Sequence, residues 1–113
     1  MAKKKKYLRK NEFRVDLNPA HRGTNGKNHP AYITARFGHM YKANTVTHAR
    51  TVNGFETLPL DENPNKQSKD KRPSRLSPPF WQNETKFSKE KLPNFRFGSL
   101  ARKKIRKYNN KFK

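Results

Sequence analysis

The sequence predicts a small, mainly β domain, folded as a partly open barrel, with a basic C-terminal helix and with disordered or extended ends. Apolar and polar residues alternate over short runs between residues 13 and 60, which is the pattern of half-buried strands. Turn signals rich in glycine and asparagine separate these runs. Hydrophobic residues make up only 30% of the 113 residues, so a single small core formed by part of the chain is expected.

Residues 1–12 form a basic arm. Four consecutive lysines, Lys3, Lys4, Lys5 and Lys6, are followed by further basic residues with no acid between them. Like charges this close repel one another in a helix. The arm is therefore predicted to stay disordered until it binds a polyanion.

Residues 13–60 are predicted to be the folded β domain. Its four short strands are expected at residues 13–17, 31–37, 40–47 and 55–60. Gly38-His39 is predicted to close a hairpin between the second and third strands, and Asn53-Gly54 is a second possible turn.

Residues 61–94 are predicted to be mostly irregular. They are polar and hold five of the eight prolines, which cannot donate a backbone hydrogen bond. Phe80-Trp81 within this segment has two interpretations. The two rings cover the open side of the barrel, which we favour, or they form a platform on which unpaired bases stack.

Residues 95–113 are predicted to form the basic C-terminal helix and tail. Ser99 is a plausible N-cap for a helix from residue 100 to about residue 108. Four side chains form an apolar stripe, and basic side chains cover the remaining surface: the stripe is Leu100, Ile105, Tyr108 and Phe112.

The charge of the chain limits its partners. Lys and Arg number 28 against 8 Asp and Glu, which gives a formal net charge of +20. Such a charge favours a polyanion. An anionic membrane would require a long amphipathic helix or an apolar anchor, which the sequence lacks, so no membrane partner is expected. A cytoplasmic location is expected because no signal-peptide core follows the first lysines, and the absence of cysteine excludes disulfides and thiol catalysis.

Nucleic acid, RNA or DNA, is therefore the predicted partner. Aromatic residues interleave with the basic ones near the C-terminus, which suits RNA or single strands better than duplex DNA. A component of a ribonucleoprotein assembly, or an accessory protein of a phage or another mobile element, fits this description. The predicted binding residues are Lys3, Lys4, Lys5, Lys6, Arg22, Lys27, Arg36, Trp81, Arg96, Arg102, Lys103, Lys104, Arg106 and Lys107.

Common catalytic and metal motifs are missing from the sequence. It has no P-loop, no nucleophile elbow and no paired carboxylates. The four histidines are spaced too widely for a compact zinc motif. No metal and no cofactor are expected.

The order of motifs in residues 13–60 resembles the first part of the MazF/PemK family of endoribonuclease toxins. Val15-Asp16-Leu17-Asn18-Pro19 resembles the end of the family's first strand, and His29-Pro30 stands where the family has a basic residue and proline. Thr45-Val46-Thr47-His48 and Asn53-Gly54 match its Thr/Ser-rich stretch and the hairpin that follows. The sequence departs from the family at His29, where arginine is usual, and after residue 60.

The resemblance implies an SH3-like barrel, RNA cleavage without a metal ion, and an acidic, antitoxin-like protein partner. His29 or His48 would then exchange protons, and Thr47 would hold the phosphate. Arg22, Lys27 or Arg36 would supply positive charge. A non-catalytic RNA-binding module is the alternative that we favour, because the charge argument depends on no motif. Whether the chain is an enzyme is left open by the sequence.

Overall fold

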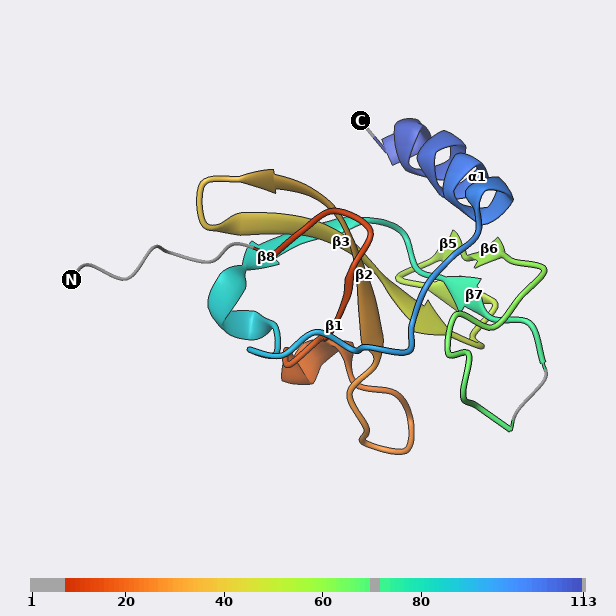
Figure 1. The fold of residues 1–113 in the computed structure, drawn as a ribbon, viewed down its shortest axis with the longest axis horizontal. Coiled ribbons are helices and arrows are strands. Elements are labelled where there is room, and N and C mark those ends of the chain that lie inside the picture. Colours follow the sequence, from red (N-terminus) through yellow and green to blue (C-terminus); the bar gives the residue numbers. More distant parts are fainter. Residues whose placement is uncertain (1–7, 70–71, 113) are drawn as a thin grey trace.

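The computed structural model describes residues 8–69 and 72–112, so the predicted binding residues Lys3, Lys4, Lys5 and Lys6 lie outside the described residues. The described residues form one antiparallel sheet, a separate hairpin and a C-terminal helix (Figure 1). The sheet contains β1 (Phe13–Val15), β2 (Pro30–Phe37), β3 (Met40–Thr47), β6 (Leu58–Pro59), β7 (Arg75–Leu76) and β8 (Phe80–Asn83), and the hairpin contains β4 (Thr51–Val52) and β5 (Phe55–Glu56).

The strand order in the main sheet is β1-β2-β3-β7-β6, and β8 pairs with β3 beside β7. The predicted mainly β fold with a C-terminal helix is confirmed, although the sheet does not close into a barrel. The predicted turns are also present. Gly38 has a φ of 62° in the β2–β3 hairpin, and Asn53 and Gly54 have φ values of 52° and 81° between β4 and β5. Positive φ at both central residues is what a type I′ hairpin turn requires.

Helix α1 (Ser99–Asn109) agrees with the predicted helix within one residue at each end. The described residues also form three short 3-10 helices: η1 (Pro19–His21), η2 (Glu84–Lys86) and η3 (Asn110–Phe112). The predicted N-cap was wrong, because Gly98 is the cap and Ser99 is the first helical residue. The Gly98 amide donates to Oε1 of Glu62 at 3.0 Å. A carboxylate distant in sequence therefore holds the chain at the start of the helix.

The segment 61–94 is mostly irregular, as predicted, but it also contributes two short strands that the sequence did not predict. Both β7 and β8 lie in it and pair with β3. Pro78 and Pro79 occupy the gap between the two strands, where Ser77 replaces regular pairing by accepting a hydrogen bond from the Thr45 amide at 2.9 Å. Prolines are tolerated there because the gap needs no ladder donor from them.

The described part of the basic arm is ordered, which also differs from the prediction. The Leu8 amide donates to the Tyr41 hydroxyl at 3.0 Å, and the Asn11 amide donates to the Ile33 carbonyl at 2.8 Å. The Ile33 amide in turn donates to the Glu12 carbonyl at 3.0 Å. Residues 8–12 therefore continue the edge of the sheet along β2 in the absence of a ligand.

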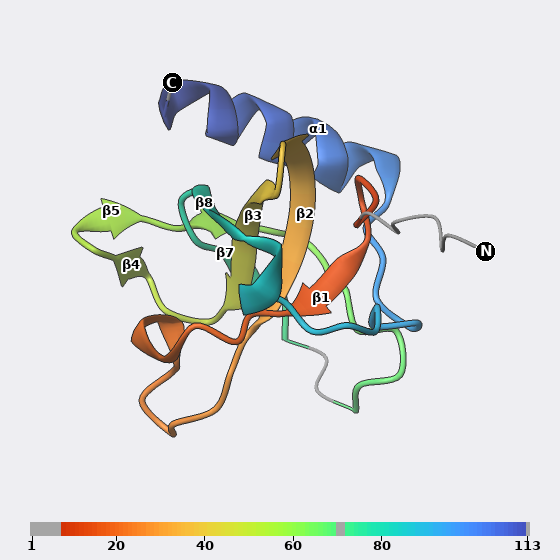
Figure 2. The same ribbon diagram turned by 90° about the vertical axis from the view of Figure 1, so that its left-hand side faces the viewer.

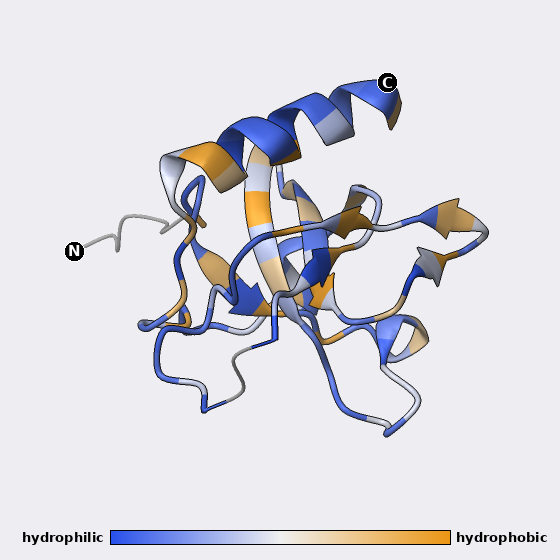
Figure 3. Cartoon of the chain, turned by 90° about the vertical axis from the view of Figure 1, so that its right-hand side faces the viewer, coloured by the Kyte–Doolittle hydropathy of each residue, from blue (hydrophilic) through white to orange (hydrophobic). Residues whose placement is uncertain are grey.

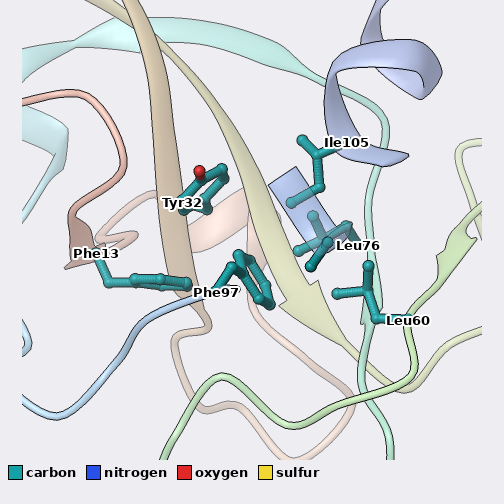
Figure 4. Close-up of a cluster of buried hydrophobic side chains, with 7 residues drawn as sticks. Phe13, Tyr32, Leu60, Leu76, Phe97 and Ile105 are labelled. Carbon is teal, nitrogen blue, oxygen red and sulfur yellow. The ribbon is translucent and has the colours of Figure 1, made fainter. Parts of the chain in front are cut away.

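Two apolar clusters cover the two faces of the sheet. The cluster under α1 draws residues from all three segments after the arm, and Figure 4 shows Phe13, Tyr32, Leu60, Leu76, Phe97 and Ile105. The other cluster contains Ala31, Ile33, Tyr41, Ala43 and Phe87. Successive strand residues point to opposite faces, so β3 contributes to both clusters. The core thus depends on chain that the prediction placed outside the β domain.

The helix lies across one side of the sheet (Figure 2), and most of it is hydrophilic (Figure 3). Its buried positions include Ala101, Ile105 and Tyr108, which recur at helical spacing. None of the helices in the described ranges is both long enough and apolar enough to cross a membrane.

Candidate nucleic-acid interface and histidine pocket

A groove of about 600 Å³ lies between α1 and strands β2 and β3. We call it the basic groove, because five basic side chains line it: Lys10, Lys42, Arg102, Lys103 and Arg106. No acidic residue is among the described residues that line it. Arg102 and Arg106 are one helical turn apart and therefore lie on the same side of α1. Lys10 and Lys42 come from the arm and from β3, so distant segments are needed to build this site.

Trp81 lies next to the basic groove. It is 46% exposed and pairs directly with Lys42 across β8 and β3. Directly opposed residues on neighbouring strands project to the same face of a sheet. An exposed indole therefore lies beside a cation of the groove. The favoured interpretation of Phe80-Trp81 holds for Phe80, which packs against the second apolar cluster, but not for Trp81.

Tyr32 shows how close the arginines come to the sheet. Burial raises the pKa of the Tyr32 phenol to about 12, while the charges of Arg102 and Arg106 act in the opposite direction. The neutral hydroxyl donates to Oδ1 of Asn11. The groove is thus bounded by a neutral phenol and by the two guanidinium groups.

Other predicted binding residues lie elsewhere. Lys104 does not line the groove and forms an ion pair with Asp61 at 2.6 Å. Three more basic residues, Lys107, Arg96 and Arg36, are exposed but line neither the groove nor the pocket described next. Lys27 is exposed in the loop before β2, and its carbonyl accepts from Gly23. The structure therefore gathers only part of the predicted basic surface, namely Arg102, Lys103 and Arg106, with Trp81 beside them.

A pocket of about 680 Å³ lies on the other side of the sheet, between the loop 19–29, the end of β3 and the β4–β5 hairpin. We call it the histidine pocket. Its polar lining includes His21, Arg22, His29, Thr45, Thr47, His48 and Ser77, and its aromatic lining is Phe55, Phe80 and Phe112. The three predicted catalytic residues, His29, Thr47 and His48, are thus in one place together with the predicted Arg22.

These three residues differ in their surroundings. His29 is half-buried, and its ring lies over Gly23, where an added Cβ would be 3.1 Å from Nε2. Thr47 is buried, and its hydroxyl oxygen accepts from the Ala49 amide at 3.1 Å. His48 is exposed at the end of β3. A glycine at position 23 thus leaves room for the His29 ring.

A buried carboxylate holds a further histidine at this pocket. Asp16 is 1% exposed, and its Oδ2 lies 2.8 Å from Nδ1 of His21. Its Oδ1 accepts from Nε2 of Gln82 at 2.9 Å and from the Asn18 amide at 3.0 Å. The His21 and Phe80 rings also meet in an edge-to-face arrangement, with ring centroids 4.7 Å apart. The carboxylate is thus fully hydrogen-bonded, as burial of a charge requires.

Sequence reasoning missed Lys42, His21, Asp16 and Gln82 as site residues. Asp16 alternates with apolar neighbours in the predicted strand 13–17, which predicts a solvent-facing side chain when only one face of the sheet is considered covered. Gln82 lay in the segment predicted to be irregular. The only local signal is the turn sequence Asp16-Leu17-Asn18-Pro19-Ala20-His21, in which a carboxylate and an imidazole flank a tight turn.

Comparison with protein families, with curated proteins and with solved structures found no match. The resemblance to MazF/PemK toxins therefore stays a prediction. In the part of the chain that the structure describes, no group of three histidine or carboxylate side chains is arranged to hold a metal ion.

Proposed function

We propose that this chain binds single-stranded nucleic acid, with RNA favoured, in the basic groove and beside Trp81. The observation that carries the proposal is the groove itself, where five cations from the arm, β3 and α1 line one cleft without an acid. Basic side chains that follow a phosphate backbone provide affinity independent of sequence. An exposed aromatic ring beside them allows an unpaired base to stack on it. The paired bases of a duplex are not available for such stacking.

The test compares two paired substitutions that remove the same charge. Arg102→Ala/Arg106→Ala removes two cations from the groove, and Lys89→Ala/Lys91→Ala removes two exposed lysines that do not line it. Binding of a labelled single-stranded RNA is measured by fluorescence anisotropy, with duplex DNA of the same length as competitor. We expect the groove variant to bind RNA more weakly and the control variant to bind like the wild type. Equal weakening of both variants would show that binding depends on total charge and would contradict the proposal.

Substitution of Trp81 provides a second test with the same binding measurement. Replacing it by alanine should cost about 1–3 kcal/mol of binding free energy, the value of one stacked base. Trp81→Phe should retain much of this energy because it keeps an aromatic face. An unchanged affinity of the alanine variant would remove the stacking part of the proposal and leave the charge part standing.

A second candidate function, metal-independent cleavage of RNA, is favoured by the histidine pocket. Histidine is the side chain whose ordinary pKa suits proton exchange near neutral pH. The pocket gathers three histidines with an arginine and three threonines, which could exchange protons and hold a phosphate. Incubation of a mixed-sequence RNA with the protein in EDTA tests this function. Cuts at discrete sites would support it, and intact RNA would leave only binding.

A further inference from the structure

We propose that His21, oriented by the buried carboxylate of Asp16, is the base that removes a proton from the RNA 2′-hydroxyl in the histidine pocket. The inference rests on the second candidate function above, because it assigns a residue to RNA cleavage. It adds a residue pair that neither the motifs nor the predicted site contained.

The position of Asp16 is the first argument. Its carboxylate is buried, and three groups hold it: the His21 ring, the Gln82 side chain and the Asn18 amide. Gln82 is itself buried on β8 and also donates to the Lys86 carbonyl at 3.1 Å, so it cannot swing away freely. A carboxylate fixed in this way orients an imidazole, as the carboxylate of a catalytic triad does.

The His21 ring is the second argument. When the carboxylate is ionised it only accepts hydrogen bonds, so a neutral ring donates across the 2.8 Å contact from Nδ1 and has Nε2 as its basic nitrogen. Among the described residues, no hydrogen bond to Nε2 is found. The side chain is 31% exposed and lines the pocket, so solvent and ligand can reach the ring.

His39 provides a comparison for His21. Its Nδ1 lies 3.3 Å from a carboxylate oxygen of Glu84, so it too is a histidine beside an acid. His39 is on the β2–β3 turn and Glu84 is in η2, both outside the pocket, and the His39 side chain is 57% exposed. His39 therefore offers a matched control for the effect of removing an imidazole that contacts a carboxylate.

The proposed step needs no metal and no co-reactant. Nε2 of His21 takes the proton of the 2′-hydroxyl, the 2′ oxygen forms a bond to phosphorus, and the bond from phosphorus to the 5′ oxygen breaks. The leaving oxygen takes a proton from His29 in its imidazolium form. The products are a 2′,3′-cyclic phosphate and a 5′-hydroxyl end. His21 then releases its extra proton to solvent, and His29 takes up one proton from solvent, which restores both side chains.

The experiment uses the full chain in EDTA, with mixed-sequence single-stranded RNA and with the same RNA carrying 2′-deoxy sugars. His21→Ala should slow cleavage about 10²–10⁴-fold, the usual contribution of a positioned base, and should leave RNA affinity unchanged. Added imidazole should restore part of the rate, because it can enter the space left by the ring. Asp16→Asn should slow cleavage, His39→Ala should not, and the 2′-deoxy strand should stay intact with every variant.

Three results would overturn the inference. Wild-type cleavage by His21→Ala would show that another group removes the proton. The second result is a loss of cleavage that imidazole does not restore, together with weaker RNA binding by both His21→Ala and the bulkier His21→Gln. It would show that His21 has a purely structural role. RNA left intact by the wild type while the groove variants lose affinity would remove cleavage and this inference together, and would leave the proposed binding function standing.

Discussion

At the scale of single residues, Glu62 joins two parts of the chain that are far apart in sequence. One carboxylate oxygen accepts from the Gly98 amide at 3.0 Å, and the other pairs with Lys66 at 2.7 Å. Burial alone would raise the pKa of Glu62, but the hydrogen bonds from Lys66 and Gly98 and the charge of Lys66 outweigh it, so the pKa lies below its ordinary value of 4.5. The ionised form therefore stabilises the start of α1.

This lowered pKa predicts a pH-dependent effect of Glu62→Gln. A group with a lowered pKa in the folded state contributes stability above its unfolded pKa and loses it as the pH falls through the folded value. We expect the variant to unfold at a lower temperature than the wild type at pH 7 and the difference to shrink as the pH falls below 4.5. Glu90→Gln, which changes an exposed glutamate, is the control. A difference that stays constant with pH would contradict the assigned role.

At the scale of elements, a pair of buried amides connects α1 to the middle of the sheet. Nδ2 of Asn44 donates to Oδ1 of Asn109 at 2.8 Å, and Nδ2 of Asn109 donates to Oδ1 of Asn44 at 3.1 Å. Asn44 also donates to the Ser77 carbonyl at 2.9 Å, beside the gap between β7 and β8. Strand β3 is therefore the element to which the helix and both late strands attach.

Asn109→Ala should lower the free energy of unfolding by about 1–3 kcal/mol, because it leaves buried polar atoms of Asn44 without partners. Chemical denaturation of the single variants and of Asn44→Ala/Asn109→Ala measures the coupling between them. The double variant should cost less than the two single variants added together. Additive costs would show that the two amides act independently.

At the scale of the whole molecule, the two candidate sites lie on opposite sides of one thin sheet. The basic groove is on the side of α1, and the histidine pocket is on the side of the loop 19–29. The chain has a formal net charge of +20, so a polyanion is attracted to both sides of the molecule. The range of this attraction depends on the salt concentration. The groove gathers five of these charges in one cleft, which is the path that we propose for RNA.

The dependence of RNA affinity on salt concentration tests whether the groove provides the phosphate contacts. For single strands, the logarithm of the affinity falls with the logarithm of the salt concentration by about 0.7 for each phosphate neutralised. Arg102→Ala/Arg106→Ala should therefore reduce this slope by about 1.4, and Lys89→Ala/Lys91→Ala should leave it unchanged. Binding measured at several potassium chloride concentrations gives the slope. An identical slope for wild type and groove variant would place the phosphate contacts elsewhere.

Local features of the sequence were sufficient to predict much of the fold. The alternating runs of β2 and β3, the turns at Gly38 and Asn53-Gly54, and the helix near residues 100–108 all depend on neighbours close in the chain. Side-chain period and backbone freedom act over a few residues, so they are visible in the sequence alone. The excess of positive charge is likewise a property of composition and needs no structure.

Only the tertiary structure decided which distant residues meet. The pairing of β7 and β8 with β3 brings Gln82 to Asp16, and the packing of α1 brings Arg102 and Arg106 to Lys42. The short strands after residue 60 have no periodic signal of their own, because prolines separate them and because they are stabilised by a neighbour that precedes them by about 30 to 40 residues. The sequence by itself thus determined the strands β2 and β3, their turns, the C-terminal helix and the excess of positive charge, whereas long-range pairing determined the late strands and the sites.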